Sequence, residues 1–415
     1  MNHEIKTENK YNTAFYLAVG SISIFVASYN IAIISVALNP IEKAFNVGSA
    51  VVYILGSLIF VGAIIGALLS GLLSDRFGRL WILAIDILTF FAAGIGSALS
   101  TNIIMLMFFR TVVGIGVGID YVVIFTYMSE VLLKNNTRNL TFIMFFANFG
   151  ILFSYLIGGI LLTLGPSGWR YVLLSGALFS IIPLIMRLKL KESKLWKIKK
   201  ISSFKSIIKN VTSKKNRKNL VRFSVPWFLY QISDQSLTLF LPLILIYALN
   251  VSSVNGAFSA VIVKAFTIPA SILAFLVIQR VGTRYLQATG FLIRSVFLGI
   301  IGFGLFFAFR ITGIEIIILL GLAFFFGSMG PDKTTVIMPV ENYDSSVRGS
   351  GQGFNEMAGR FGGLFGILLF SVFGIAGIDT GLIFLSITSL LGFIVTILYI
   401  NKNDVKTGDQ VLYKN

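Results

Sequence analysis

The stretch GLLSDRFGR, residues 71–79, holds three charged residues between two long apolar runs, 50–73 and 80–99. A helix needs about 20 mostly apolar residues to cross the hydrocarbon core of a bilayer. Each run is long enough, and Gly71 and Gly78 allow the polar stretch to turn tightly. The stretch therefore predicts a short loop at a membrane surface that joins two membrane-spanning helices.

The composition extends this prediction to the whole chain. The 415 residues are 56% hydrophobic and 12% charged, and the mean hydropathy is +0.88. Soluble proteins carry about a quarter charged residues. Because lipid cannot hydrogen-bond to an exposed backbone, the spans must be helices. We predict an all-α integral membrane protein.

Twelve apolar segments are long enough to span a bilayer. We place them at 13–38, 50–73, 80–99, 103–132, 139–163, 170–188, 221–248, 255–279, 285–308, 313–340, 350–374 and 379–400. A basic stretch separates the sixth from the seventh. We therefore expect an N-terminal tail (1–12), a six-helix bundle (13–188), a basic linker (189–219), a second six-helix bundle (220–400) and a C-terminal tail (401–415).

Lysine and arginine concentrate on one side of the predicted membrane. The segment 187–222 holds fourteen Lys and Arg residues against one acid, Glu192. The other loops of that side carry Arg76, Arg79, Lys134, Arg138, Arg280, Arg284 and Arg348, and the opposite loops carry Lys43, Arg170 and Arg310. Cytoplasmic loops are the basic ones, so we expect both termini in the cytoplasm and the protein in the cell membrane. We set aside a nucleic-acid site at KKNRK (214–218), since a basic loop beside anionic lipid explains the same charges.

The two halves of the chain repeat a spaced pattern of charges. Asp120, Glu130 and Arg138 recur 210–212 residues later as Asp332, Glu341 and Arg348. Residues 74–79, SDRFGR, are echoed at 279–284 by QRVGTR. Parallel repeats are typical of transporters whose solute site lies between the halves, near the middle of the membrane.

The sequence lacks the residues that several kinds of functional site require. There is no Cys, and His3 in the polar N-terminal tail is the only His, which excludes thiolate and histidine metal centres and a histidine proton relay. No phosphate-binding loop of the G-x-x-x-x-G-K-[ST] type occurs. GIGVG (114–118) lies inside an apolar run, where Gly114 and Gly118 favour helix packing over nucleotide binding. We expect no cofactor, no metal and no enzymatic centre.

Four stretches resemble the major facilitator superfamily. The loop at 71–79 resembles its signature loop between spans two and three. RTVVGIGVGIDY (110–121), with Glu130 and Arg138 beyond it, resembles span four of the sugar-porter and phosphate:proton-symporter branches. Residues 330–363 resemble their spans ten and eleven, and PWFLYQISDQS (226–236) resembles span seven of the phosphate branch. The resemblance implies the major facilitator fold, with two six-helix repeats and transport by alternating access.

The resemblance to the phosphate branch is incomplete at the solute positions. Asp120, Tyr121 and Trp227 match it. Asn30 and Gln231 stand where that branch has Asp, Ala147 or Asn148 stands at a Gln position, Asp332 at an Asn position and Arg360 at a Lys position. The comparison implies a solute other than inorganic phosphate, and the missing acid in span one weakens the case for proton coupling.

The charges around the short loop predict a conformational latch. Asp75 can pair with basic residues where helices meet, and Arg76 and Arg79 can reach Glu130 at the end of span four. Such ion pairs would hold the two halves together while the cytoplasmic side is closed. The predicted latch residues are Gly71, Asp75, Arg76, Gly78, Arg79, Glu130, Arg138, Glu341 and Arg348. We expect a lopsided latch, because Gln279 replaces the acid in the second copy.

Ionisable residues deep in a span are rare and usually face a cavity. Three cations at that depth, Lys264, Lys333 and Arg360, predict a cavity that attracts anions. The predicted solute contacts are Asn30, Arg110, Tyr121, Trp227, Tyr230, Gln231, Gln235, Lys264, Lys333 and Arg360. The candidate proton carriers are the carboxylates Asp120, Asp234 and Asp332, since no His is available. We interpret Asp86, Arg294 and Glu356 as structural.

Asp120 leads the candidates for a proton carrier. An ionised acid that faced lipid would cost several kcal/mol. It must therefore face the cavity, be protonated, or pair with a cation such as Arg360. Arg110, near the outer end of the same span, is interpreted as an anchor, a gate or a solute contact.

These features predict a secondary active transporter of a small polar, anionic metabolite, coupled to protons in symport. The alternatives are uptake of a neutral sugar and efflux of a metabolite or drug by the same fold. A non-transporting membrane sensor is a remote alternative, because the large basic loop of about 35 residues has no room for a signalling domain. The expected partners are the solute, protons and the lipid bilayer, and we expect a monomer.

Overall fold

The computed structural model describes residues 2–133, 135–199, 203–309 and 313–400, which form helices and short connections without a strand. The helices are α1 (Asn2–Phe45), α2 (Ser49–Phe77), α3 (Arg79–Ala98), α4 (Ile103–Val131), α5 (Asn136–Leu162), α6 (Gly168–Arg187), α7 (Lys194–Lys199), α8 (Phe204–Val211), α9 (Lys214–Leu249), α10 (Ser253–Ala265), α11 (Thr267–Val281), α12 (Thr283–Phe306), α13 (Gly313–Met329), α14 (Pro331–Asn342), α15 (Arg348–Ala376) and α16 (Ile378–Tyr399).

The described residues contain twelve helices long and apolar enough to cross a membrane, which confirms the predicted number. Two of these spans are interrupted, because α10 and α11 together form one and α13 and α14 another. Several spans run past their predicted ends, and α9 begins inside the predicted linker at Lys214. The spans were predicted from runs of apolar residues. Such runs do not include the polar turns by which a helix extends beyond the lipid, so the predicted ends fall short.

Proline explains both interruptions. A proline inside a helix removes a backbone hydrogen bond and disfavours helical geometry in the residue before it. Pro331 follows Gly330, whose φ of −109° and ψ of −97° end α13. Pro269 lies three residues after Phe266, where α10 and α11 meet. A side chain at Gly330 would also collide with the backbone oxygen of Leu286, so glycine lets α12 lie against the interruption.

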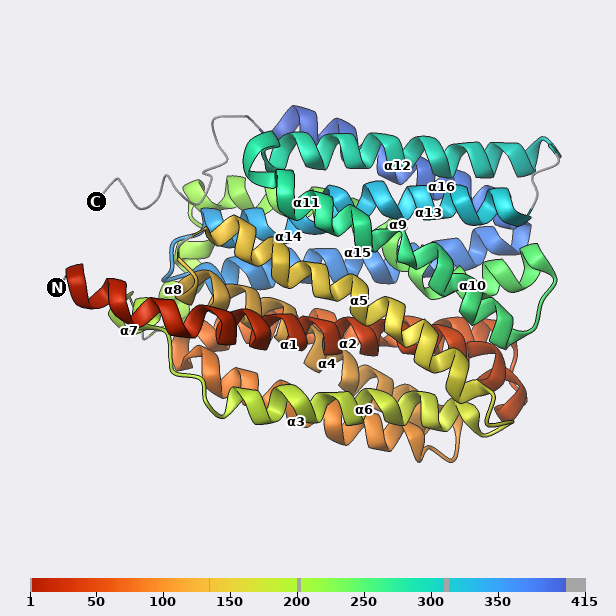
Figure 1. Ribbon diagram of the computed structural model, residues 1–415, viewed down its shortest axis with the longest axis horizontal. Helices are drawn as coiled ribbons and strands as arrows, with labels where there is room; N and C mark the ends of the chain where they lie inside the picture. The colour runs from red at the N-terminus through yellow and green to blue at the C-terminus, as the bar shows by residue number, and fades with distance from the viewer. Residues whose placement is uncertain (1, 134, 200–202, 310–312, 401–415) are drawn as a thin grey trace.

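The spans lie side by side along the long axis of the molecule (Figure 1). Helices α3 and α6 flank one edge, and α12 and α16 flank the other. Between them α2 packs on α15, α1 on α9 and α5 on α10, so these three pairs join the first six spans to the last six. The start of α1 and the linker helices α7 and α8 lie at the same end (Figure 1); we name it the latch end.

Glycines allow the closest helix contacts, as predicted for the G-x-x-x-G spacing. Added side chains at Gly114 and Gly118 of α4 would collide with the backbone oxygens of Ile59 and Ala63 on α2. A Cβ atom at Gly71 would lie 2.6 Å from the backbone oxygen of Gly349 on α15. In a membrane, where apolar burial does not drive helices together, close backbone packing stabilises the helix pair instead.

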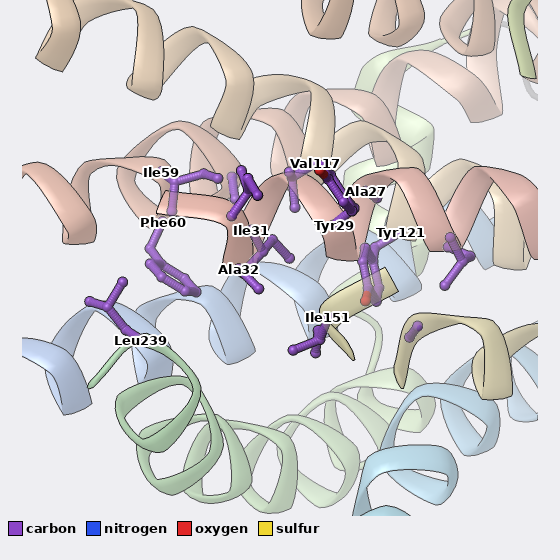
Figure 2. Close-up of a cluster of buried hydrophobic side chains, with 14 of the residues drawn as sticks. Ala27, Tyr29, Ile31, Ala32, Ile59, Phe60, Val117, Tyr121, Ile151 and Leu239 are labelled. Carbon is purple, nitrogen blue, oxygen red and sulfur yellow. The ribbon is translucent and has the colours of Figure 1, made fainter. Parts of the chain in front are cut away.

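A cluster of buried apolar side chains on the first six spans reaches Leu239 of α9 in the second half. Figure 2 shows this cluster, with Ala27, Tyr29, Ile31, Ala32, Ile59, Phe60, Val117, Tyr121, Ile151 and Leu239 labelled. At the end of α2 opposite the latch, Tyr53 packs edge-on against Phe240 of α9, with ring centroids 5.1 Å apart. Gly56 leaves room there for Leu239, which would lie 3.0 Å from an added Cβ atom. The halves are therefore in contact at both ends of the molecule.

We predict that Gly118→Ala destabilises the fold, because the new methyl group would overlap the backbone of α2. Overpacking of this kind costs about 1–3 kcal/mol, so the thermal unfolding midpoint in detergent should fall by several degrees. Gly48→Ala is the matched control, since nothing lies within 4 Å of its added Cβ atom. Equal unfolding midpoints for the two variants would contradict this account of the α2–α4 contact.

Candidate functional site

At the latch end, the carboxylate of Asp75 in the last turn of α2 binds the first turn of α15. It accepts hydrogen bonds from the backbone N–H groups of Gly349 and Ser350, at 3.1 and 2.7 Å, and from the Ser350 hydroxyl at 2.6 Å. The first N–H groups of a helix have no partner inside the helix and form its positive end. A carboxylate of one half therefore caps a helix of the other half.

Arg79 joins this cap to α4. Its guanidinium donates to Asp75 Oδ1 at 2.7 Å and to Glu130 Oε1 at 2.8 Å, and all three side chains are buried. Gly78 reverses the chain between α2 and α3 with a φ of +109°, a conformation that favours glycine. A side chain there would also press on Glu192. The glycine thus positions Arg79 between two carboxylates.

The sequence predicted the contacts of Asp75, Arg79 and Glu130, and the structure brings these residues together. The guanidinium of Arg76 lies over the ring of Phe77, 5.0 Å from the centroid.

The second copy of the pattern also reaches across to the first half, but through different partners. Glu341 of α14 accepts a hydrogen bond from the Thr137 hydroxyl of α5. Arg348 donates to the Ser129 hydroxyl of α4 at 3.4 Å. Arg138 of α5 lies over Phe275 of α11, 4.4 Å from the ring centroid. These contacts of the second copy therefore differ from those of Asp75, Arg79 and Glu130 in the first.

The linker packs on the latch residues, which the sequence interpretation of a solvated basic loop missed. The Trp196 indole of α7 donates to the backbone oxygen of Asp75 at 2.8 Å, and Glu192 accepts from the backbone N–H of Leu80 at 3.2 Å. Ile207 and Val211 of α8 are buried against Val347. The four-residue spacing of these two apolar side chains is the signal that could have predicted an amphipathic helix.

Asp120, the acid in the middle of α4, pairs with a cation that the sequence interpretation did not single out. The Arg187 guanidinium reaches in from the last turn of α6 and lies 2.6 Å from Asp120 Oδ1. It lies 2.6 Å from Asp86 Oδ1 of α3 as well. The expected alternatives included a cation partner, but the partner is Arg187 and not Arg360. Asp86, interpreted from sequence as structural, shares that arginine.

The Asp86–Asp120 pair is under-satisfied. One guanidinium serves two buried carboxylates, and the second oxygen of each, Oδ2, accepts no hydrogen bond from the described residues. Two buried carboxylates with one cation leave one negative charge without compensation. A proton on the pair would remove that charge and supply a donor between the carboxylates.

Asp332 and Lys333, in the first turn of α14, form an ion pair with each other. The Asn148 amide of α5 donates to Asp332 Oδ2 at 3.0 Å and to the Ser271 hydroxyl of α11 at 3.3 Å. This polar group therefore crosses between the halves near the middle of the spans. Asn148 was considered in the sequence comparison but not counted as a solute contact.

Arg360 on α15 connects the halves at a second place. Its guanidinium lies over the Tyr121 ring, 4.4 Å from the centroid, and donates to Glu356 at 3.2 Å. The Tyr121 hydroxyl shares a 2.7 Å hydrogen bond with Ser28 of α1. Tyr121 and Arg360 are thus brought together as predicted solute contacts, and Glu356 is the acid that balances Arg360.

The predicted polar and aromatic face of α9 lies inside the protein. The rings of Trp227 and Tyr230 stack with centroids 5.9 Å apart. The Tyr230 hydroxyl donates to Asp234 at 3.1 Å. Gln235 donates to Gln231 at 2.7 Å. These contacts follow the three- and four-residue spacing of the sequence.

Lys264 and Arg294 lie on the ring of Phe324. The Lys264 ammonium is 4.1 Å and the Arg294 guanidinium 5.5 Å from its centroid. Lys264 is buried, and no carboxylate of the described residues lies within 4.0 Å of its ammonium. Arg294 lies 3.3 Å from Asp234, yet none of its guanidinium nitrogens makes a hydrogen bond within the described part of the chain.

Asn30 and Arg110 were also predicted as solute contacts. In the structure their hydrogen bonds stay within the first six spans. Arg110 donates to the backbone oxygen of Asn30 at 2.8 Å. The Asn30 amide donates to the backbone oxygens of Val26 and Gly176 at 3.0 and 3.4 Å. These bonds join α1, α4 and α6 within the first six spans, so they fit the anchor alternative for Arg110.

Curated relatives of the chain are transporters. The chain is 26% identical over 414 residues to the inorganic phosphate transporter 1-11 of Oryza sativa subsp. japonica, covering 81% of this chain and 74% of that one. It is 26% identical over 363 residues to the arabinose-proton symporter of Bacillus subtilis (strain 168), covering 78% of each. Among solved structures, the proton:xylose symporter XylE bound to 6-bromo-6-deoxy-D-glucose matches with a TM-score of 0.82 and 17% identity, over 98% of this chain and 100% of that one, which shows a shared fold.

The family model of the Major Facilitator Superfamily matches residues 20–337, more than half of the chain. This match agrees with the twelve spans, the loop at 71–79 and the charge repeat. The protein belongs to the Major Facilitator Superfamily and is a multi-pass membrane transporter.

Proposed function

We propose that the protein imports a small monovalent anion by symport with protons, through alternating access between the two six-span bundles. In this proposal the latch end faces the cytoplasm, as the basic loops of that side indicate. The solute binds between the bundles, near the cations of α10, α12, α14 and α15. The phosphate and sugar transporters among the relatives support small polar solutes as a class.

The observation that carries the proposal is a surplus of buried positive charge in the second bundle. Four cations at the level of the site accompany three carboxylates: Lys264, Arg294, Lys333 and Arg360 against Asp234, Asp332 and Glu356. Lys264 is the cation without a carboxylate among the described residues, and Arg294 lacks hydrogen bonds. An unpaired buried charge costs several kcal/mol, so an anion bound here would be strongly stabilised.

Aromatic rings surround the charged groups of Lys264 and Arg294. Trp227 stacks on Tyr230, and Phe324 lies under both Lys264 and Arg294. The face of a ring attracts a cation electrostatically but has no lone pair that accepts an N–H hydrogen bond. The donors of Lys264 and Arg294 therefore remain for the solute. The arrangement suits one carboxylate or one phosphate monoanion on a small body.

We predict that Lys264→Met weakens binding of the transported anion about 100-fold, since removing one partner of a buried charge pair costs about 2–5 kcal/mol. Methionine keeps the apolar stem, so the protein should stay folded. Lys43→Met, on an exposed side chain at the far end of α1, is the matched control. Binding is measured with purified protein against pools of monocarboxylates, inorganic phosphate and uncharged sugars.

The same experiment separates the anion proposal from the sugar alternative. Arg360→Lys should bind the anion more weakly than the wild type, because a point charge replaces a planar fork. An uncharged sugar that binds as tightly as any anion, with an affinity that Lys264→Met leaves unchanged, would overturn the anion proposal.

The proposed proton site is the Asp86–Asp120 pair. Both carboxylates share Arg187, and each keeps one oxygen without a hydrogen bond in the described residues. Loss of a proton would strengthen both contacts to Arg187, and gain of one would loosen them. Asp120 thus remains the leading carrier, with Asp86 as its partner and with Asp234 and Asp332 behind them.

We predict that Asp120→Asn abolishes accumulation driven by a pH difference but leaves exchange of labelled solute across proteoliposome membranes. Asparagine keeps a hydrogen-bond acceptor for Arg187 but cannot carry a proton. Glu315→Gln, an exposed acid at the start of α13, serves as the control and should accumulate solute normally. If Asp120→Asn still concentrates solute under a pH difference alone, Asp120 is not the carrier.

Another prediction concerns the cap on α15. Asp75→Asn loses the charge that binds the positive end of this helix, so the closed arrangement at the latch end should be less stable. Turnover should fall at least several-fold, while solute affinity of the purified protein changes less than twofold, because the cap lies far from Lys264. A variant with normal turnover would refute the role of Asp75 as a latch.

A further inference from the structure

A cavity of about 790 Å³ opens at the latch end, between the start of α9 and the end of α16. It lies apart from the proposed solute site. Among the described residues its lining consists of Thr212, Lys214, Arg217, Lys218, Val221, Arg222, Leu398 and Tyr399. Four of these eight side chains are basic and none is acidic, so the cavity is a positively charged site.

The basic residues occupy one face of α9. Spacings of three, four and eight residues from Lys214 place Arg217, Lys218 and Arg222 on neighbouring turns of the same side. Cations in the first turns of a helix are disfavoured by its positive end. Here the positive end of α9 adds to the charges of the basic side chains. Both contributions make the electrostatic potential in the cavity positive, which favours an anion.

The cavity also has an apolar part. Val221 and Leu398 are 54% and 67% exposed. They belong to the membrane-spanning segments Asn216–Leu249 and Ile378–Tyr399. Exposed apolar side chains at the end of a span meet acyl chains, and a tyrosine such as Tyr399 is typical of the level of the lipid headgroups. The cavity thus combines phosphate-binding charge with an apolar side at the depth of the membrane surface.

We propose that this cavity binds the phosphodiester headgroup of an anionic phospholipid. Arg217 and Lys218 contact the phosphate, where the arginine fork matches two of its oxygens. Leu398 and Val221 contact the upper part of an acyl chain. Inorganic phosphate shares the charge but would leave the apolar contacts unused, so a lipid is the better occupant. Basic pockets between transmembrane helices are suited to such headgroups.

The test measures lipid binding to the full-length protein in a neutral detergent by native mass spectrometry. Phosphatidylglycerol is the probe, and phosphatidylcholine and inorganic phosphate are the comparison ligands. We expect phosphatidylglycerol to bind at least tenfold more tightly than phosphatidylcholine, and inorganic phosphate to displace it poorly. The double variant Arg217→Gln with Lys218→Gln should weaken phosphatidylglycerol binding tenfold or more.

The matched control removes the same charge elsewhere. Lys205 and Lys209 are exposed on α8, four residues apart and outside the cavity lining. Lys205→Gln with Lys209→Gln should change the affinity for phosphatidylglycerol less than twofold. An equal loss in this control would assign the binding to general charge attraction and overturn the site. Equal binding of phosphatidylcholine, or ready displacement by inorganic phosphate, would overturn the proposed occupant.

Discussion

A carboxylate that caps a helix of the opposite bundle is the contact on which the closed latch end depends. Asp75 satisfies the unpaired N–H groups at the start of α15, and Arg79 ties it to Glu130 at the end of α4. The helix that it caps also carries Glu356 and Arg360 about two and three turns further on. Separation of the bundles at this end therefore exposes the first N–H groups of α15 to water. It also moves α15, which holds Arg360 against Tyr121.

The buried charges divide unequally between the bundles. Around Arg187 two carboxylates share one cation. Around Phe324 there are two cations, and Asp234 pairs with Arg294 but not with Lys264. Under the proposed function, a proton relieves the first imbalance and an anion relieves the second. The two ligands together are electrically neutral, so the loaded protein buries less unpaired charge than the empty one. This is a physical reason for a symporter to change conformation readily when both ligands are bound.

Local sequence patterns were sufficient for much of this arrangement. Apolar length gave the twelve spans, helical spacing gave the inward face of α9 from Trp227 to Gln235, and the short loop gave the contacts of Asp75 and Arg79. Pairings between distant helices were beyond such patterns. Arg187 and Asp120 are 67 residues apart, and their contact depends on how α6 packs against α3 and α1. Asn30 and Arg110 show the same limit, because both were predicted as solute contacts and both form hydrogen bonds within their own bundle.

The interruption between α13 and α14 separates two environments within one span. Residues Pro331–Val340 of α14 are buried, whereas Ile314 and Ile318 of α13 are exposed on the outer surface. A bend at Gly330 could therefore carry Asp332 and Lys333 to new positions while α13 keeps its place among the surrounding lipid tails. The energy of such a bend would depend mainly on packing inside the protein and little on bilayer thickness or fluidity. A site charge could then move without the membrane having to deform around it.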